Sequence, residues 1–296
     1  MFEPIPLVWI LSLVIQDTPG RLEGQATMNL AGVLTNLLTL ATFAWHDGSE
    51  KSVVPNSVKE HLETEVLRPI GKPYTVLVEG NVGSGKSTTL NYFATQTPEK
   101  DLVDVVFEPV NLWRNLSGVD LLNQMFTDPQ RWALAFQSYS SLTRYSNVFK
   151  PTPKKYRIME RSIFSERACF LDTVHEQPNG MTEVEFNIMH QWYQMMTKTF
   201  WDQLKPDIIV YVKCDVDVLM QRIKKRGRPE EANISRDFVE TIQRRHDDWL
   251  IHRNSSFVPP APVLVLDGNL EVGKFLELVK AKEAVIFGGQ LRRTDT

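Results

Sequence analysis

A glycine-rich loop that follows a predicted strand constrains the fold of this chain more than any other stretch. Residues Gly80–Ser87 read GNVGSGKS and match G-x-x-x-x-G-K-S, the pattern of a phosphate-binding loop. The apolar, β-branched run Thr75–Val78 before it is typical of a buried strand, and Thr88–Ala94 after it can form a helix. A glycine-rich turn could match by chance, but the flanking strand and helix favour a site for a nucleoside triphosphate.

Each group of such a loop has an expected role. Glycines let the backbone curl so that successive N–H groups point at phosphate oxygens, and the start of the next helix adds a favourable dipole. Lys86 would reach the terminal phosphates, and the Ser87 hydroxyl would bind Mg²⁺. The residues expected to contact the nucleoside triphosphate are Gly80, Asn81, Val82, Gly83, Ser84, Gly85, Lys86, Ser87 and Thr88.

Composition narrows the class of protein. The chain has 296 residues with 42% hydrophobic and 23% charged content, which is typical of a globular protein. Its net charge of −3 argues against nucleic acid as the main partner. The two cysteines, Cys169 and Cys214, exclude a disulfide framework and a cysteine-based zinc site, and they fit a reducing compartment.

The first 72 residues differ from the rest of the chain. The apolar run Ile5–Ile15 is too short to span a bilayer, and asparagines interrupt Met28–Trp45, so we expect no stable membrane span. Arg21 is the only basic residue before position 50, and no cleavage site is evident. We therefore find no convincing targeting signal. Residues 1–72 stay an unassigned extension, and both cytoplasm and mitochondrion stay open.

From Tyr74 onward, short apolar runs alternate with helical patterns. The predicted strands are Thr75–Val78, Val103–Phe107, Arg157–Met159, Ile208–Val212 and Val263–Leu266. The predicted helices between them are Ser117–Met125, Arg131–Phe149, Thr182–Leu204, Val216–Arg226 and Arg236–Ile251. This alternation predicts a doubly wound α/β fold: a parallel sheet of five strands with helices on both faces and ligands at the strands' carboxyl ends. We place this domain at residues 73–287 and a tail at 288–296.

Two carboxylates follow predicted strands next to the loop. Glu108 could take a proton from a substrate hydroxyl, and the less favoured alternative is a surface turn with an incidental glutamate. Glu160 could help to position Mg²⁺, and Arg161 could neutralise charge on a transferred phosphoryl group. A structural salt bridge is the alternative for this second pair.

Two further stretches of the sequence carry clustered polar or charged side chains. Gln137, Ser140 or Ser141, and Arg144 share one face of a predicted helix, which could line a nucleobase pocket or simply be solvated. The basic stretch Gln221–Glu231 could be a short lid over phosphates or a charged surface helix. No His, Cys, Asp or Glu cluster has metal-site spacing, and the histidines appear structural.

Six short sequence motifs follow one another between residue 74 and about residue 285. They are EGNVGSGKS at 79–87, EPVNLW at 108–113, FQSY at 136–139, MERSIFSER at 159–167, RGRPEE at 226–231 and DDWLIHR at 247–253. Together they resemble the deoxynucleoside kinase family, which groups deoxycytidine, deoxyguanosine and mitochondrial thymidine kinases with a broad-specificity insect enzyme. The resemblance implies a P-loop kinase fold with a short basic lid, and residues 1–72 have no counterpart in it.

The resemblance also implies ATP-dependent phosphorylation of the 5′-hydroxyl of a deoxynucleoside, in nucleotide salvage. Glu108 would be the general base, Arg161 would assist at the 5′-oxygen, and Ser87 with Glu160 would hold Mg²⁺. The phosphates would be held by Lys86, Arg226 and Arg228. The implied substrate contacts are Glu108, Trp113, Met125, Phe126, Phe136, Gln137, Arg144, Arg161, Glu166, Phe170 and Glu231.

Three positions bear on the substrate. The family usually has a tyrosine that contacts the sugar 3′-hydroxyl where this chain has Phe126, so a hydrogen bond worth roughly 0.5–1.5 kcal/mol should be missing. We therefore expect weaker discrimination against 3′-deoxy analogues. Arg144 and Glu166 resemble the charged pair of the deoxycytidine and deoxyguanosine kinases. They predict a preference for purine deoxynucleosides or deoxycytidine over thymidine.

Two other functions stay open on the sequence. A thymidylate-type nucleoside monophosphate kinase would share the loop and a basic lid. A non-catalytic subunit with the same fold is a second possibility, although Lys86, Ser87, Glu108 and Arg161 are all intact. By resemblance, we also expect a homodimer that uses part of the surplus apolar surface in Thr182–Leu204 and Ser117–Met125, for which core packing is the alternative.

Overall fold

The computed structural model of the chain describes residues 72–177, 179–228, 231 and 234–289. All of them belong to one unit of the chain, Leu67–Thr296. The interpretations of residues 1–71 and of the tail from residue 290 lie outside the described residues. Within the described ranges, no helix is long and apolar enough to cross a membrane.

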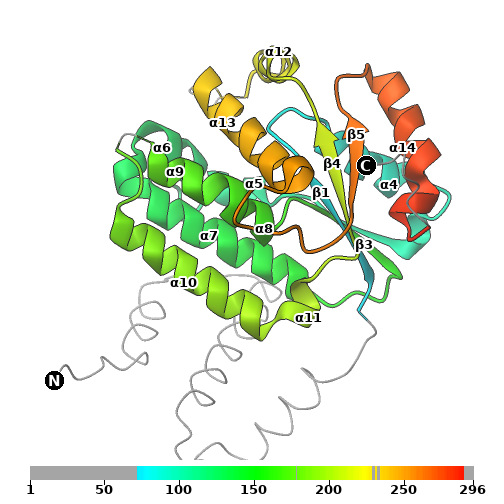
Figure 1. Cartoon of the computed structure of the whole chain (residues 1–296), viewed down its shortest axis with the longest axis horizontal. Helices are drawn as coiled ribbons and strands as arrows, with labels where there is room; N and C mark the ends of the chain where they lie inside the picture. The colour runs from blue at the N-terminus through cyan, green and yellow to red at the C-terminus, as the bar shows by residue number, and fades with distance from the viewer. Residues whose placement is uncertain (1–71, 178, 229–230, 232–233, 290–296) are drawn as a thin grey trace, which may run out of the picture. The chain divides into compact units, whose positions relative to one another are not determined.

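A parallel sheet of five strands forms the centre of this unit (Figure 1). Its order is β2-β3-β1-β4-β5, and all neighbouring strands pair in parallel. The bounds are β1 Tyr74–Glu79, β2 Val103–Val106, β3 Tyr156–Glu160, β4 Ile208–Lys213 and β5 Val263–Asp267. The predicted strands and the α/β fold class are thus confirmed, with shifts of at most one residue at the strand ends.

Helices cover both faces of the sheet, as parallel strands require. The α-helices are α4 Lys86–Thr95, α5 Val110–Arg114, α6 Leu121–Thr127, α7 Pro129–Phe149, α8 Ile163–Ser165, α9 Asp172–Glu176, α10 Glu183–Thr199, α11 Trp201–Leu204, α12 Val216–Arg226, α13 Arg236–Asp247 and α14 Val272–Ile286. A 3₁₀ turn, η1, spans Lys100–Leu102, and two π-helical segments are η2 Glu166–Leu171 and η4 Asp248–His252.

The alternating side chains of β1 show how the two layers form. Val76 and Val78 point into a core that they share with α4 and α14, where Phe93 and Phe275 are buried. Leu77, between them, points into the opposite core with residues of α8, η2 and η4. Because both faces are covered, the central residues Val76–Val78 are all apolar, and a charged side chain follows only at Glu79, the carboxyl end of the strand.

The predicted helix Ser117–Met125 is wrong at its start. Helix α6 begins only at Leu121, and the Asp120 side chain caps it by accepting a hydrogen bond from the Asn123 amide. Ser117 and Gly118 have φ of 53° and 83°, which is left-handed backbone that a right-handed helix cannot contain.

Two longer predicted helices are not continuous α-helices over their predicted length. Thr182–Leu204 divides at Phe200, whose φ of −115° and ψ of 26° separate α10 from α11. Arg236–Ile251 is α-helical only to Asp247 and then continues as the π-helical η4. The sequence patterns placed no helix at Val272–Ile286, which forms α14.

Candidate active site

The phosphate-binding loop connects β1 to α4, and its shape requires glycine. Gly80 has a φ of 143°, and a Cβ built there would lie 2.6 Å from the Val212 carbonyl oxygen. Gly85, immediately before α4, has a φ of 113°. Side chains at these positions would therefore strain the backbone or collide with β4.

Lys86 is the buried cation of the loop. Only 5% of the residue is exposed, and its Nζ donates a hydrogen bond to the Asn81 carbonyl oxygen over 2.7 Å. Burial, and next the positive charge of Arg161, lower the pKa of Lys86 to about 7. An anionic phosphate at the loop would favour the charged ammonium.

Ser87 and Glu160 lie together at the edge of the loop. The Ser87 hydroxyl donates a hydrogen bond to Glu160 Oε1 over 2.9 Å. A hydroxyl and a carboxylate oxygen fit the oxygen preference of Mg²⁺, which commonly completes its shell with phosphate oxygens and water. Among the described residues no group of three or more His, Cys, Asp or Glu side chains could hold a metal ion, so the protein provides only part of such a shell.

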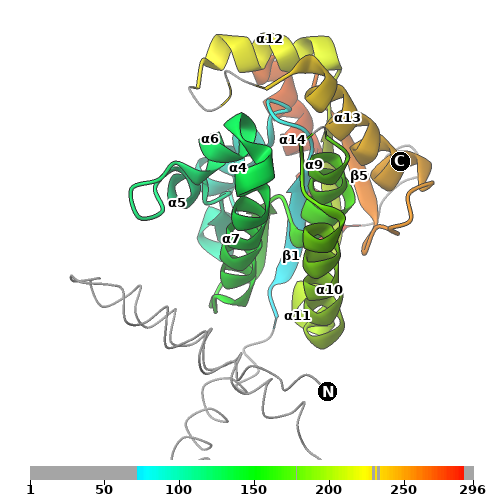
Figure 2. The ribbon, with the colours of Figure 1, turned by 90° about the vertical axis from the view of Figure 1, so that its left-hand side faces the viewer.

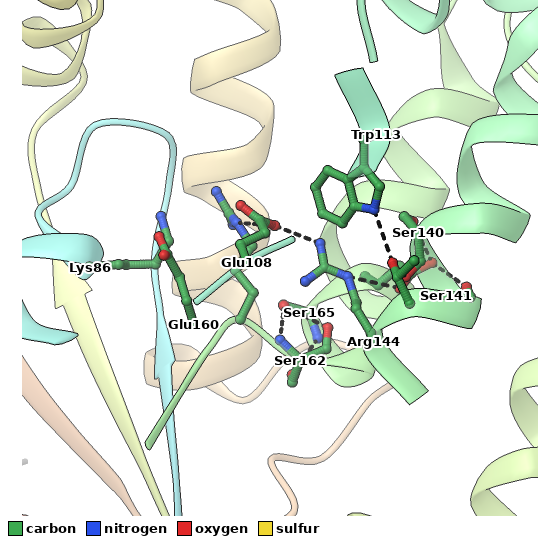
Figure 3. Close-up of polar contacts among 12 residues, drawn as sticks. Lys86, Glu108, Trp113, Ser140, Ser141, Arg144, Glu160, Ser162 and Ser165 are labelled. Atoms are coloured by element: carbon green, nitrogen blue, oxygen red, sulfur yellow. Dashed lines mark hydrogen bonds and ion pairs between the residues drawn. The ribbon is translucent and has the colours of Figure 1, made fainter. Parts of the chain in front are cut away.

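Glu108 follows β2 and lies between two arginines (Figure 3). Its Oε1 is 2.6 Å from Arg144 Nη2 and 3.2 Å from Arg161 Nε. Burial alone would raise the pKa of Glu108, but Arg161 and Arg144 outweigh it and hold the pKa below its usual range. The carboxylate is therefore ionised at neutral pH and can accept a proton.

Arg161 is held in place by its backbone as well as its side chain. Its φ is 62°, its amide donates to the Val78 carbonyl over 2.9 Å, and its Nη1 donates to the Gly80 carbonyl over 2.9 Å. The guanidinium lies 4.6 Å from the centre of the Phe170 ring. These contacts connect the end of β3 to the phosphate-binding loop.

The residue after Arg161 anchors the same turn. Ser162 Oγ donates to Glu79 Oε1 over 2.5 Å and accepts hydrogen bonds from the amides of Phe164 and Ser165 at the start of α8. Glu79 is fully buried, and burial raises the pKa of its carboxyl group. The turn that carries Arg161 is therefore connected to β1 by a buried polar contact.

The predicted polar face of α7 points toward the same place. Arg144 Nε is 3.2 Å from Glu166 Oε2, and the Arg144 guanidinium lies 5.0 Å from the Trp113 ring centre. Ser140 donates to Glu166 Oε1 over 3.1 Å, and Ser141 donates to the same oxygen. The structure thus brings Arg144 and Glu166 together as a buried ion pair. Arg144 also contacts Glu108, so the three side chains form one charged cluster.

Gln137 and the aromatic residues border this ion pair. Gln137 is 2% exposed, and its side-chain amide makes no hydrogen bond within the described part of the chain. Trp113 and Phe136 meet edge to face at 5.5 Å between ring centres. Phe126 packs in the same way on Phe238 at 5.6 Å, and the effect of its missing hydroxyl on the sugar stays a prediction. Met125 is buried in the same cluster as Trp113 and Phe136.

The two arginines of the basic lid, Arg226 and Arg228, both contact Glu231 rather than the phosphate-binding loop. Glu231 accepts hydrogen bonds from Arg226 Nη2 at 2.6 Å and Nε at 3.0 Å, and Arg228 Nη1 lies 3.5 Å away. No contact of Arg226 or Arg228 with the phosphate-binding loop occurs among residues that the structure describes. Their roles toward phosphate, and that of Glu231 toward the sugar, stay predictions.

The sequence places Arg222 in the basic stretch Gln221–Glu231 but indicates no individual role for it. Its Nη1 lies 3.4 Å from the carbonyl oxygens of both Gly83 and Ser84, and its Nη2 donates to the Leu270 carbonyl over 3.1 Å. Arg222 precedes Arg226 by one helical turn on α12, so its position in the basic cluster was the available signal. Figures 1 and 2 show α12 lying across the carboxyl end of the sheet.

A buried histidine lies behind Phe170. His246 is fully buried, stacks on Tyr211 at 5.9 Å and meets Phe170 edge to face at 6.1 Å. Its Nδ1 is 2.8 Å from the Ile242 carbonyl oxygen, so Nδ1 carries the proton of the neutral ring. Burial, and next Arg161, lower the pKa of His246 to about 3.

This shift predicts a specific loss of stability in acid. An unfolded histidine binds a proton below about pH 6.5, whereas folded His246 resists protonation until about pH 3. Its contribution is complete above pH 6.5 and is lost as the pH falls toward 3, by up to about 5 kcal/mol. We expect denaturant unfolding of His246→Phe to depend less steeply on pH between 6.5 and 4. The exposed-site variant His252→Phe should retain the wild-type slope, and equal slopes for all three proteins would contradict the prediction.

Comparison with known proteins agrees with this geometry. The family model described as deoxynucleoside kinase matches residues 76–287. Mitochondrial thymidine kinase 2 from Homo sapiens is 36% identical over 207 residues, which cover 70% of this chain and 75% of the relative. Deoxycytidine kinase from Homo sapiens is 30% identical over 236 residues, which cover 70% of this chain and 89% of the relative. The phosphate-binding loop, the Glu108 cluster and these matches lead to one conclusion: the chain belongs to the deoxynucleoside kinase family and is an ATP-dependent phosphotransferase.

Proposed function

We propose that this kinase phosphorylates the 5′-hydroxyl of purine deoxynucleosides or deoxycytidine in preference to thymidine. The observation that carries the proposal is the buried contact between Arg144 and Glu166, which extends to Glu108 at 2.6 Å. Charged groups at a base pocket reject a base that leaves them unpaired, because an unsatisfied buried polar group is costly. The pair also occupies space that a thymine methyl group would need.

In the proposed mechanism, Glu108 accepts the proton of the 5′-hydroxyl as that oxygen attacks the γ-phosphorus of ATP. The bond between the γ-phosphorus and its bridging oxygen breaks, and ADP leaves. Arg161 lies 3.2 Å from this carboxylate and is positioned to stabilise negative charge near the reacting oxygen. Lys86 would exchange the Asn81 carbonyl for a phosphate oxygen. Mg²⁺, held in part by Ser87 and Glu160, would supply neutralisation of the phosphate charge.

The alternatives are less well supported. A monophosphate acceptor would bring a second phosphate next to the ionised Glu108, whereas a nucleoside brings a neutral hydroxyl. A non-catalytic subunit would not require the ordered contacts of Lys86, Glu108 and Arg161. The family of the chain favours a nucleoside acceptor and an active enzyme.

The first test replaces the proposed base. In Glu108→Gln the side chain keeps its shape but cannot accept the proton, so we expect kcat for the best deoxynucleoside to fall by about 10²- to 10⁴-fold. Initial rates with deoxynucleosides and with their monophosphates measure both the loss and the acceptor. Glu277→Gln, at an exposed position on α14, is the matched control and should keep full activity. Phosphorylation of monophosphates alone would refute the proposed acceptor.

A second test addresses the preference for the base. Removing Arg144 alone would leave the buried Glu166 and Glu108 without their shared cation, so Arg144→Leu should be combined with Glu166→Ala. We expect the ratio of kcat/KM for thymidine to that for deoxycytidine to rise by roughly 10- to 100-fold, because a few kcal/mol of discrimination is removed. A wild type that prefers thymidine, or a double variant with an unchanged ratio, would contradict the proposed pocket.

We further propose that the chain forms a homodimer through the outer face of α10. Four apolar side chains at helical spacing are exposed there: Val184 70%, Ile188 44%, Trp192 49% and Met195 41%. A continuous stripe of this kind is typical of an association surface. One self-complementary face on each chain would close a two-fold dimer.

The dimer predicts a simple change in mass. Wild type should have about twice the 34.0 kDa chain mass by light scattering, and Trp192→Lys should shift toward the monomer because it places a charge in the stripe. Leu102→Lys, at an exposed leucine of η1, is the control and should remain dimeric. A monomeric wild type would exclude this interface. The compartment, cytoplasm or mitochondrion, stays a prediction that imaging of the tagged full chain would test.

A further inference from the structure

Asn81 occupies an unusual place in the phosphate-binding loop because its carbonyl oxygen and both polar groups of its side chain are hydrogen-bonded. Its carbonyl oxygen accepts the Lys86 ammonium at 2.7 Å. Its side-chain Oδ1 accepts the Val82 amide at 2.8 Å. The residue has no exposed surface. The conformation of this one residue therefore sets both the position of the lysine and the direction of the next peptide.

The side-chain amide of Asn81 connects the loop to α13. Its Nδ2 donates to the Val239 carbonyl over 2.8 Å and to Gln243 Oε1 over 3.4 Å. Val239 is fully buried and Gln243 is 8% exposed. These residues lie one turn apart on α13, so the helix presents two acceptors to one amide.

Gln243 is itself held from the other side. Its Nε2 donates to the Tyr211 hydroxyl over 2.7 Å, and that hydroxyl donates to Asp247 Oδ1 over 2.7 Å. Asp247 Oδ2 is 3.4 Å from Lys213 Nζ at the end of β4. The Gln243 amide thus bridges β4 to the phosphate-binding loop, and its orientation is determined because the donor faces Tyr211 and the acceptor faces Asn81.

We propose that Gln243 is a positioning residue for the phosphate-binding loop: through Asn81, it holds the loop in the shape that receives the nucleotide phosphates. The proposal rests on ATP use by this family but assigns Gln243 no contact with the nucleotide. Loss of the contact would leave Asn81 with a single acceptor on α13 and let the peptide between Asn81 and Val82 rotate. The Lys86 ammonium and the loop amides would then be less well ordered before phosphate binds.

The position of α13 explains why this contact matters for the nucleotide and not for the nucleoside. Helix α13 begins at Arg236, directly after the lid that α12 leads into, and Asn81 lies at the beginning of the loop. The Glu108, Arg144 and Glu166 cluster lies on other elements and makes no contact with Gln243 among the described residues. A change at Gln243 should therefore affect phosphate binding selectively.

The test compares two substitutions of Gln243 that should act in opposite ways. Gln243→Met keeps the length of the side chain but removes its hydrogen bonds to Asn81, Tyr211 and Asp247. Gln243→Glu keeps an acceptor for Asn81 but loses the donor toward Tyr211 and places a second carboxylate near Asp247. For each full-length protein, ADP affinity is measured by titration calorimetry, KM for ATP and for the deoxynucleoside by initial rates, and Tm by thermal unfolding.

For Gln243→Met we expect the ADP Kd and the ATP KM to rise by about 3- to 10-fold, as expected for the loss of one hydrogen bond. The deoxynucleoside KM should stay within about twofold of wild type. For Gln243→Glu we expect the larger fall in Tm, because of the neighbouring carboxylates, but an ADP Kd closer to wild type. Affinity and stability should thus rank the two variants in opposite order.

A purely structural role would give a different result. If ADP affinity falls in parallel with Tm across both variants, or if Gln243→Met binds ADP as wild type does, the positioning role is refuted. An equal rise in the KM of both substrates would also refute it. A wild type that does not bind ADP at all would instead overturn the proposed function, so the two failures are distinguishable.

Discussion

The site depends on one buried carboxylate that two arginines share. Glu108 lies 2.6 Å from Arg144 and 3.2 Å from Arg161, and none of the three side chains is more than 15% exposed. A buried carboxylate without such partners would take up a proton and lose its use as a base. The two guanidinium groups keep it ionised, and each also has a second contact: Arg161 with the phosphate-binding loop, Arg144 with Glu166.

The topology of the sheet makes this convergence possible. In a parallel sheet the carboxyl ends of all strands lie at one edge, and β3 lies between β2 and β1 in the order. The residues after these strands, Glu108, Arg161 and the loop from Gly80, therefore meet there. The left-handed turn at Arg161 then directs its amide to Val78 and its guanidinium to Glu108. Strained backbone of this kind persists where surrounding contacts determine it.

Sequence patterns predicted the parts that depend on local chemistry. The five strands, the phosphate-binding loop and the shared face of Gln137 and Arg144 follow from apolar periodicity, glycine positions and helical spacing. The break at Phe200 and the π-helical ends were not predicted, because tertiary packing decides them and no proline or glycine marks them. The sequence also did not predict which distant side chains contact one another. Only the folded chain brings Gln243 to Asn81, across 162 residues of sequence.

The contacts that we propose to select the substrate also hold the buried charges of the site together, and this restricts how the proposed specificity can change. Arg144 balances both Glu108 and Glu166, so its loss alone would leave Glu166 buried without its cation and Glu108 with Arg161 but not Arg144. Removing one member of a buried ion pair commonly costs several kcal/mol, whereas replacing both members with apolar groups is often neutral. A chain of this fold can therefore exchange a charged base pocket for an apolar one only by changing Arg144 and Glu166 together. Glu108 would then depend on Arg161 alone to remain ionised.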